Sequence, residues 1–136
     1  MTQGEERSDV VGTRVLFENE TIRVWDFTLE PGDVSELHRH IRDYVFVYVT
    51  DDNQLEVRVP GEVPKRVHAP DGYVAYTSVG SATDGQLTHQ LANVGERAHR
   101  QILVELLQSP AVRRDRPAQT ETNGVGSDAW ADRSTV

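Results

Sequence analysis

The chain has 136 residues, of which 26% are charged and 37% hydrophobic, and its formal net charge at pH 7 is −8. This length suits one domain with a core of its own, and the absence of cysteine excludes disulfide bonds and thiolate metal ligands. The negative charge argues against a nucleic-acid surface, which needs a basic face, and no apolar run reaches the roughly 20 residues of a membrane-spanning helix.

Residues 1–11 are polar and charged, and we expect them to form a flexible N-terminal arm. They have neither a basic start nor an apolar stretch, so no secretory signal is expected and the predicted location is the cytoplasm.

Residues 12–107 are expected to form one domain of eight or nine short strands. Trp25, Phe27 and Leu29 share one parity in a strand-like run and predict an inward face. A turn follows at residues 30–33, where proline precedes glycine. Residues 54–59 alternate between polar and apolar, which is typical of a strand with one wet face.

Further turns are expected at Pro60-Gly61 and Asp71-Gly72, with an exposed loop over residues 78–85. Strand-like runs then cover residues 87–92 and 100–107. No helical period is sustained before residue 100, so the pattern predicts an all-β antiparallel sandwich or barrel. Residues 108–136 are rich in Arg, Asp, Thr, Ser and Pro and predict a disordered polar tail.

Two histidines two positions apart, His38 and His40, precede the strand-like run of residues 44–49. Residues two apart in a strand share a face, so both imidazoles can point at one ion. His89 lies in another strand-like run and offers a third nitrogen donor. Three neutral nitrogen donors suit zinc, iron, copper or nickel. Glu36 and Tyr44 have the same parity as the histidines and are expected to face the same space.

These segments resemble a known family. Gly32, five residues and His38-x-His40 resemble the first cupin motif, and Gly72 followed by His89-(x)3-Asn93 resembles the second. The resemblance covers about residues 12–107. Within that family, the chain is similar to small stand-alone cupins, some of which are labelled as β-alanine-degradation proteins. It implies an antiparallel jelly-roll β-barrel with a metal in its mouth, commonly as a homodimer. An unpaired edge strand is a liability, which also favours dimerisation.

The sequence departs from the cupin motifs at several positions. Tyr44 occupies the position of the glutamate ligand in the first motif, and Asp51 occupies the position of the glycine that closes this motif. Ser78 replaces a proline of the second motif, and six extra residues before His89 imply a longer loop at the barrel rim. Three histidines without a carboxylate leave the full +2 charge on a divalent ion, which favours anionic, metal-chelating substrates.

Each candidate residue also has a plainer interpretation. Tyr44 is interpreted as a pocket residue that donates a hydrogen bond near the metal, or simply packs, because a phenol must lose a proton with pKa near ~10 to bind strongly. Glu36 either replaces the missing carboxylate or is a solvated rim residue. Asn93 is expected to stabilise a turn. His68 and His99 are expected on the surface.

Phe46, Tyr48, Leu87 and Leu91 have the parity of pocket-lining residues, although core packing explains them equally well. Asp43 is out of phase with the histidines and is expected to face away from them.

The resulting hypothesis is a cupin enzyme with His38, His40 and His89 as metal ligands and with Tyr44 and Glu36 as candidate catalytic residues. Iron(II) is the favoured metal, with zinc, nickel or manganese as competitors. The substrate is expected to be a small molecule that bears a carboxylate, and the chemistry that of a Lewis acid or, by analogy with three-His iron cupins, of a dioxygenase. The alternatives are a non-catalytic module that holds a metal or small ligand for a partner protein, and a degenerate cupin without metal.

Overall fold

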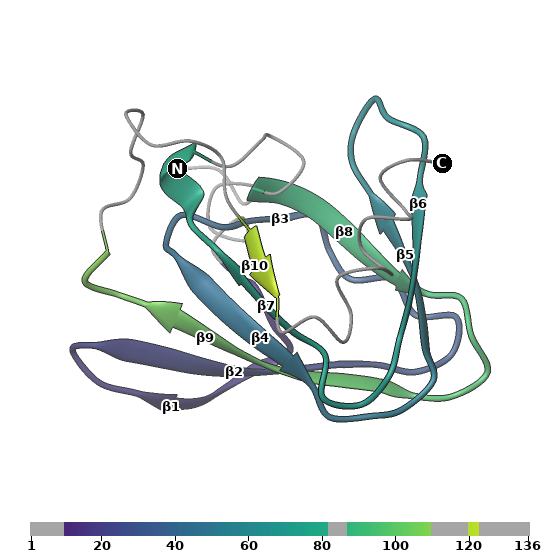
Figure 1. Cartoon of the computed structure of the whole chain (residues 1–136), viewed down its shortest axis with the longest axis horizontal. Helices are drawn as coiled ribbons and strands as arrows, with labels where there is room; N and C mark the ends of the chain where they lie inside the picture. The colour runs from purple at the N-terminus through teal and green to yellow at the C-terminus, as the bar shows by residue number, and fades with distance from the viewer. Residues whose placement is uncertain (1–9, 82–86, 110–119, 123–136) are drawn as a thin grey trace.

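The computed structural model describes residues 10–81, 87–109 and 120–122, and ten strands and one short 3-10 helix lie within these ranges (Figure 1). Nine of the strands lie before residue 107, in agreement with the strand pattern of the sequence. The elements are β1 (Arg14–Glu18), β2 (Ile22–Leu29), β3 (His38–Arg39), β4 (Tyr44–Tyr48), β5 (Asn53–Arg58), β6 (Lys65–Ala69), β7 (Val74–Thr77), η1 (Val79–Ser81), β8 (Thr88–Asn93), β9 (His99–Leu106) and β10 (Thr120–Thr122).

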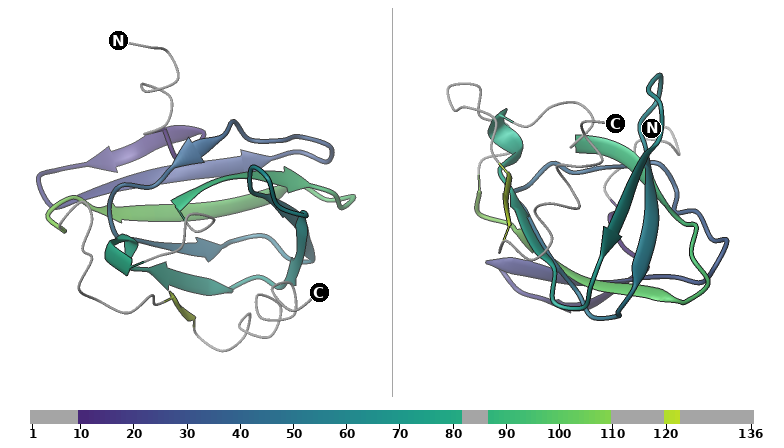
Figure 2. Two further views of the ribbon diagram at one scale, coloured as in Figure 1. Left: turned by 90° about the horizontal axis from the view of Figure 1, so that it is seen from above. Right: turned by 45° about the vertical axis from the view of Figure 1, so that its right-hand side comes forward.

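The strands form two antiparallel sheets. The larger sheet has the order β1-β2-β9-β4-β7-β10, and the smaller has the order β3-β8-β5-β6. The two sheets face each other around a common interior, with β3 and β8 opposite β4 and β9 (Figures 1 and 2). The all-β antiparallel barrel predicted from the sequence is therefore confirmed.

Glycine-containing turns define the ends of several strands, as the sequence predicts. Gly32 and Gly72 have φ angles of 89° and 87°, a left-handed conformation that favours glycine because it has no Cβ. At the first turn, the Asp33 amide donates to the Glu30 carbonyl at 2.9 Å. This turn directs the chain from β2 toward the segment that carries His38 and His40.

The core lies between the inner faces of the two sheets. Trp25, Phe27 and Leu29 are all buried, so the inward face predicted for their strand is confirmed. On β5, Leu55 and Val57 are buried while Gln54, Glu56 and Arg58 are half-buried. Full burial of a side chain such as Leu55 raises the free energy of unfolding by about 1.5–3 kcal/mol relative to an exposed side chain.

The packed region extends slightly beyond the expected boundaries of residues 12–107. Val11, which was assigned to the N-terminal arm, is only 1% exposed and packs in the core. Ser109, assigned to the tail, accepts a hydrogen bond from the Asp43 amide at 3.0 Å.

Most of the expected arm and polar tail, residues 1–9, 110–119 and 123–136, lies outside the described residues. Within the tail, Thr120–Thr122 forms β10 and pairs with β7, an element that the sequence did not predict. Across the described parts of the chain, no helix has the length and apolar character needed to span a membrane.

Candidate metal centre

The His-x-His segment runs antiparallel along β8. The amides of Gly32 and Ser35 donate to the carbonyls of Asn93 and Leu91 at 3.0 and 2.8 Å. Farther along, His38 is paired directly with His89. The His40 amide then donates to the Leu87 carbonyl at 2.7 Å. Backbone hydrogen bonds along the whole segment therefore set the register that brings His89 to the His-x-His pair.

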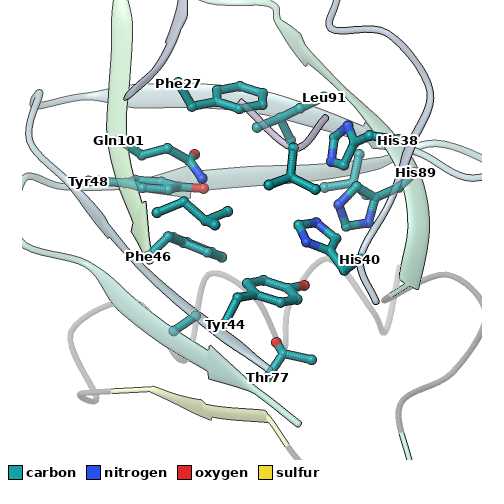
Figure 3. Close-up of a pocket in the computed structure, with 14 residues that line it drawn as sticks. Phe27, His38, His40, Tyr44, Phe46, Tyr48, Thr77, His89, Leu91 and Gln101 are labelled. Carbon is teal, nitrogen blue, oxygen red and sulfur yellow. The ribbon is translucent and has the colours of Figure 1, made fainter. Parts of the chain in front are cut away.

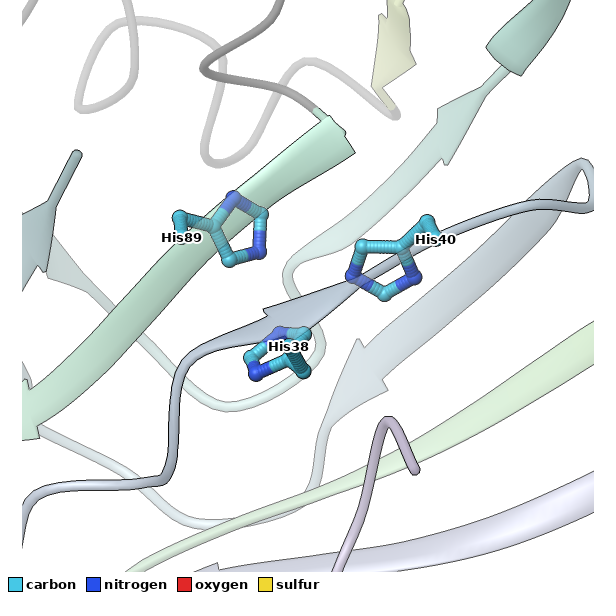
Figure 4. A group of neighbouring side chains, drawn as sticks. All are labelled: His38, His40 and His89. Atoms are coloured by element: carbon cyan, nitrogen blue, oxygen red, sulfur yellow. The ribbon is translucent and has the colours of Figure 1, made fainter. Parts of the chain in front are cut away.

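Three imidazoles converge at this position (Figure 4). One potential ligand atom from each of His38, His40 and His89 lies within 4.8 Å of the other two. The ring centroids are 5.0 Å apart for His38 and His40, 4.7 Å for His38 and His89, and 5.2 Å for His40 and His89. The structure therefore brings together the three residues that the sequence singled out, in an arrangement suited to a divalent metal ion.

The surroundings keep two of the rings in the form that binds metals. Burial, and next the neighbouring His89, lower the pKa of His38 to about 3, and burial lowers the pKa of His40 well below its usual range. Both rings are therefore neutral at neutral pH and carry a lone pair. The Nδ1 atom of His38 lies 3.0 Å from the Glu36 carbonyl oxygen. Its proton is held there, which leaves Nε2 as the available donor atom.

A buried polar atom of His40 supports the assignment of these three histidines to a metal site. Nδ1 of His40 is buried and makes no hydrogen bond with the described residues. A buried nitrogen without a partner costs about 1–3 kcal/mol. An imidazole in this state fits a site that takes a further partner from a bound ion.

The histidines lie in one wall of a buried pocket between the two sheets (Figure 3). About 50 Å³ of it is open to the centres of water molecules, and one water needs roughly 10–15 Å³ on this measure. The pocket therefore suits a small ligand. Apart from the three histidines, it is lined by Val11, Phe27, Tyr44, Phe46, Tyr48, Val57, Ala75, Thr77, Leu91, Gln101 and Leu103.

This set contains three of the four residues that the sequence assigned to the pocket by parity, Phe46, Tyr48 and Leu91. Leu87 is half-buried and packs against the neighbouring core cluster.

Tyr44 stacks on one of the candidate ligands. Its ring lies 3.8 Å from that of His40, at an interplanar angle of 18°. Burial raises the pKa of Tyr44 to about 12, an effect partly offset by a hydrogen bond with Thr77. The phenol therefore keeps its proton at neutral pH, as expected for a residue that donates a hydrogen bond rather than one that supplies an anionic ligand.

Glu36 is placed differently from Tyr44. Its side chain is exposed and is not among the described residues that line this pocket. Its backbone carbonyl, however, orients His38. No carboxylate occurs among the described lining residues, so the geometry supports a backbone role for Glu36.

Two polar residues near the site support the backbone. Asn93 donates from Nδ2 to the carbonyls of Leu29 and Arg97 at 2.9 and 2.8 Å, and its Oδ1 accepts from the Gly95 amide at 3.0 Å. The prediction that Asn93 stabilises a turn is therefore confirmed. Asp43 is buried, and its carboxylate accepts from the Val79 amide at 3.0 Å.

The prediction that His99 lies on the surface is wrong. His99 is 1% exposed and lies between Asn53 and Gln101. His68, by contrast, is exposed as predicted. His99 was misplaced because it follows a turn and the strand was started one residue too late.

Gln101 lines the pocket and was missed as well. In β9, His99, Gln101, Leu103 and Glu105 share one buried face. The parity that these residues share with Leu103 was the available signal. Because the other three are polar, the sequence pattern did not identify this face as buried.

Comparisons with known proteins agree with this architecture. The sequence matches no protein-family model and no curated protein. Among solved structures, a cupin domain from Bordetella pertussis Tohama I superimposes with a TM-score of 0.58 and 24% identity, over 68% of this chain and 88% of that one. An uncharacterised protein with a double-stranded β-helix domain from Klebsiella pneumoniae has a TM-score of 0.53 and 15% identity, over 90% of this chain and 95% of that one. The chain therefore has the fold of the cupin, or double-stranded β-helix, proteins.

Proposed function

We propose that this protein is a metal-dependent cupin enzyme that acts on a small molecule bearing a carboxylate. The observation that carries the proposal is the convergence of ligand atoms from His38, His40 and His89 within 4.8 Å in the wall of a buried pocket. Iron(II) is the favoured metal, with zinc, nickel or manganese as alternatives. A bound metal would supply Lewis-acid chemistry or, in the case of iron, oxygen chemistry.

The charge of the pocket supports an anionic substrate. Its described lining contains no carboxylate, lysine or arginine. Neutral histidines do not cancel the charge of a divalent ion, and the apolar surroundings screen that charge less than water does. A carboxylate therefore gains more from binding here than a neutral group of the same size.

Tyr44 is the candidate proton donor within the pocket. Its ring is fixed against His40 and its hydroxyl bonds with Thr77. We expect Tyr44→Phe to preserve the stacking and the metal affinity but to lower turnover by about 10²-fold or more, the usual contribution of a positioned proton donor. Glu36 is assigned to the orientation of His38 through its backbone carbonyl, so Glu36→Gln is expected to lower turnover only slightly.

The absence of a carboxylate from the described lining also favours the second candidate, a non-catalytic module that holds a metal or small ligand for a partner protein. Few groups besides Tyr44 are available for acid–base chemistry. The two functions differ in their assays. An enzyme consumes oxygen or converts a candidate acid when its metal is bound, whereas a module is stabilised by ligand and shows no turnover.

Elemental analysis of the purified protein is the decisive experiment, with His38→Ala and His89→Ala as variants and His68→Ala as control. About one metal per chain, retained only in the wild type and the control, is expected. A redox-active metal would lead to oxygen-uptake assays with small acids. Absence of metal from folded wild-type protein, even after reconstitution, would contradict the three-His site and the enzyme, and would leave a module that binds a small ligand.

We further propose that the protein is a homodimer formed through β1. This strand is at the edge of the larger sheet and is exposed along its length. Val15, Leu16 and Phe17 are 45%, 41% and 53% exposed. An apolar edge strand invites pairing with another chain, and a second copy that presents the same strand satisfies this symmetrically.

A further inference from the structure

Two buried amides and one buried imidazole form a hydrogen-bonded chain from Asn53 to the pocket. Asn53, at the start of β5, places Oδ1 2.7 Å from Nδ1 of His99. On the other side of the ring, Nε2 lies 2.7 Å from Oε1 of Gln101. The three side chains are 1–4% exposed. Gln101 lines the pocket and faces it from the side away from the histidines (Figure 3).

The orientation of Asn53 is determined by its neighbours. Its Nδ2 atom donates to the backbone carbonyls of Thr50 and Ala69, the latter at 3.1 Å. Its Oδ1 atom accepts from the Thr50 hydroxyl at 2.7 Å. Turning this amide by 180° would place an oxygen against two carbonyl oxygens. Oδ1 therefore faces His99, and only a protonated Nδ1 can bond to it.

The state of His99 follows from this contact and from burial. Burial lowers the pKa of His99 to about 4, so the ring carries a single proton at neutral pH. That proton is on Nδ1, because Asn53 offers only an acceptor there. Nε2 consequently presents a lone pair toward Gln101.

A lone pair on Nε2 requires a donor from Gln101. With Oε1 directed at His99, two acceptors would face each other at 2.7 Å. Rotation of the Gln101 amide about its last bond exchanges Oε1 and Nε2 with almost no change in shape. The contact then becomes an N–H···N hydrogen bond, and the carbonyl oxygen turns toward the pocket.

We propose that the chain from Asn53 through His99 fixes Gln101 with its side-chain carbonyl oxygen toward the pocket, and that this oxygen selects ligands with a hydroxyl group at the end remote from the metal. The proposal rests on the proposed function for the metal end of the ligand. A hydroxyl is a neutral donor and loses less solvation in this apolar pocket than an ammonium group does. The ligand class is therefore a short hydroxycarboxylate.

The orientation can be tested without any ligand. Long-range 1H–15N spectra of the metal-free protein at pH 7, with the His99 signals assigned from their loss in His99→Gln, should show a protonated Nδ1 and an unprotonated Nε2. A proton on Nε2, or a doubly protonated ring, would overturn the proposed direction of the amide.

The selectivity is tested by calorimetry on zinc-loaded protein. We compare 3-hydroxypropanoate with butanoate, and 4-hydroxybutanoate with pentanoate, because a methyl group replaces the hydroxyl in each pair. The hydroxy acid of the better-fitting pair should bind about three- to tenfold more tightly, the range of one hydrogen bond. Gln101→Met should remove this preference and leave zinc affinity unchanged. Gln90→Met, whose amide bonds with the Ser35 carbonyl outside the pocket, should retain the preference.

The outcomes separate this inference from the proposed function. Equal binding within both pairs, or no binding of any of the four acids, with zinc bound would overturn the selectivity while the metal site stands. Failure of the folded protein to bind zinc, iron(II), nickel or manganese would overturn the proposed function and the ligand class together, and the spectra would still decide the direction of the Gln101 amide.

Discussion

His38 and His89 are direct cross-strand partners in the antiparallel pair of β3 and β8. Directly opposed residues in such a pair have their side chains on the same face and within about 4.5–5.5 Å at Cβ. The metal site is therefore part of the sheet register. A shift of β8 by one residue would turn His89 to the other face.

Metal binding should stabilise the folded protein through these histidines. Zinc at about 100 times its Kd is expected to raise the free energy of unfolding by about 2.7 kcal/mol, which raises the melting temperature of a domain of this size by roughly 10 °C. The measurement is thermal unfolding with zinc and with a chelator. His38→Ala and His89→Ala should lose the increase, and His68→Ala should keep it. An equal increase in all four proteins would place the zinc elsewhere.

The buried His99 predicts a pH dependence of stability. Its pKa is about 4 in the folded protein and about 6.5 when unfolded, so the unfolded state binds more protons between these values. The contribution of His99 to the free energy of unfolding is complete above about pH 6.5. It falls by up to about 3 kcal/mol as the pH drops to about 4.

Urea unfolding of the metal-free protein between pH 4 and 7 measures this contribution. His99→Gln should flatten the dependence on pH relative to the wild type. If the free energy of unfolding depends on pH identically in the wild type and in His99→Gln, His99 titrates normally in the folded state.

Glu105 is expected to be a strong stabilising residue of the larger sheet. It is 2% exposed, and its carboxylate accepts a hydrogen bond from Nε1 of Trp25 at 2.7 Å. Glu105→Ala leaves that buried N–H without its partner and should lower the free energy of unfolding by about 2–4 kcal/mol. Denaturant unfolding followed by tryptophan fluorescence measures it, with the exposed Glu62→Ala as control. A loss as small as that of the control would contradict the role of this bond.

Asn93 should contribute more to stability than another turn asparagine, Asn19. Asn93→Ala removes three hydrogen bonds that join the end of β8 to β2 and to the next turn, an expected loss of about 2–4 kcal/mol. Asn19→Ala removes two bonds, to the amides of Thr21 and Ile22, in an exposed turn. Denaturant unfolding of both variants checks the order, and a larger loss for Asn19→Ala would reverse it.

The proposed dimer is tested on β1. Phe17→Glu places a charge on the exposed apolar edge and should convert the dimer to monomer, as measured by size-exclusion chromatography with light scattering. Val63→Glu is the matched control, because Val63 is 81% exposed and lies between β5 and β6, away from that edge. A monomeric wild type, or a Phe17→Glu variant that stays dimeric, would refute the proposed interface.

Local sequence determined much of this protein. Alternation of polar and apolar residues and the glycine-containing turns were enough to predict the strands. The two-residue spacing placed His38 and His40 on one face, because that periodicity is a property of any extended chain. The family-like spacing also identified His89 and Asn93, since each lies at a fixed place in its strand.

The tertiary structure decided which residues meet inside the barrel. Burial of His99 and the inward direction of Gln101 depend on the partners of β9 in the larger sheet, and no local pattern of polar residues reveals such burial. The exposed side chain of Glu36 and the stacking of Tyr44 on His40 likewise depend on packing across the interior. Strand propensity acts over neighbouring residues, whereas a pocket is formed by side chains from strands far apart in sequence.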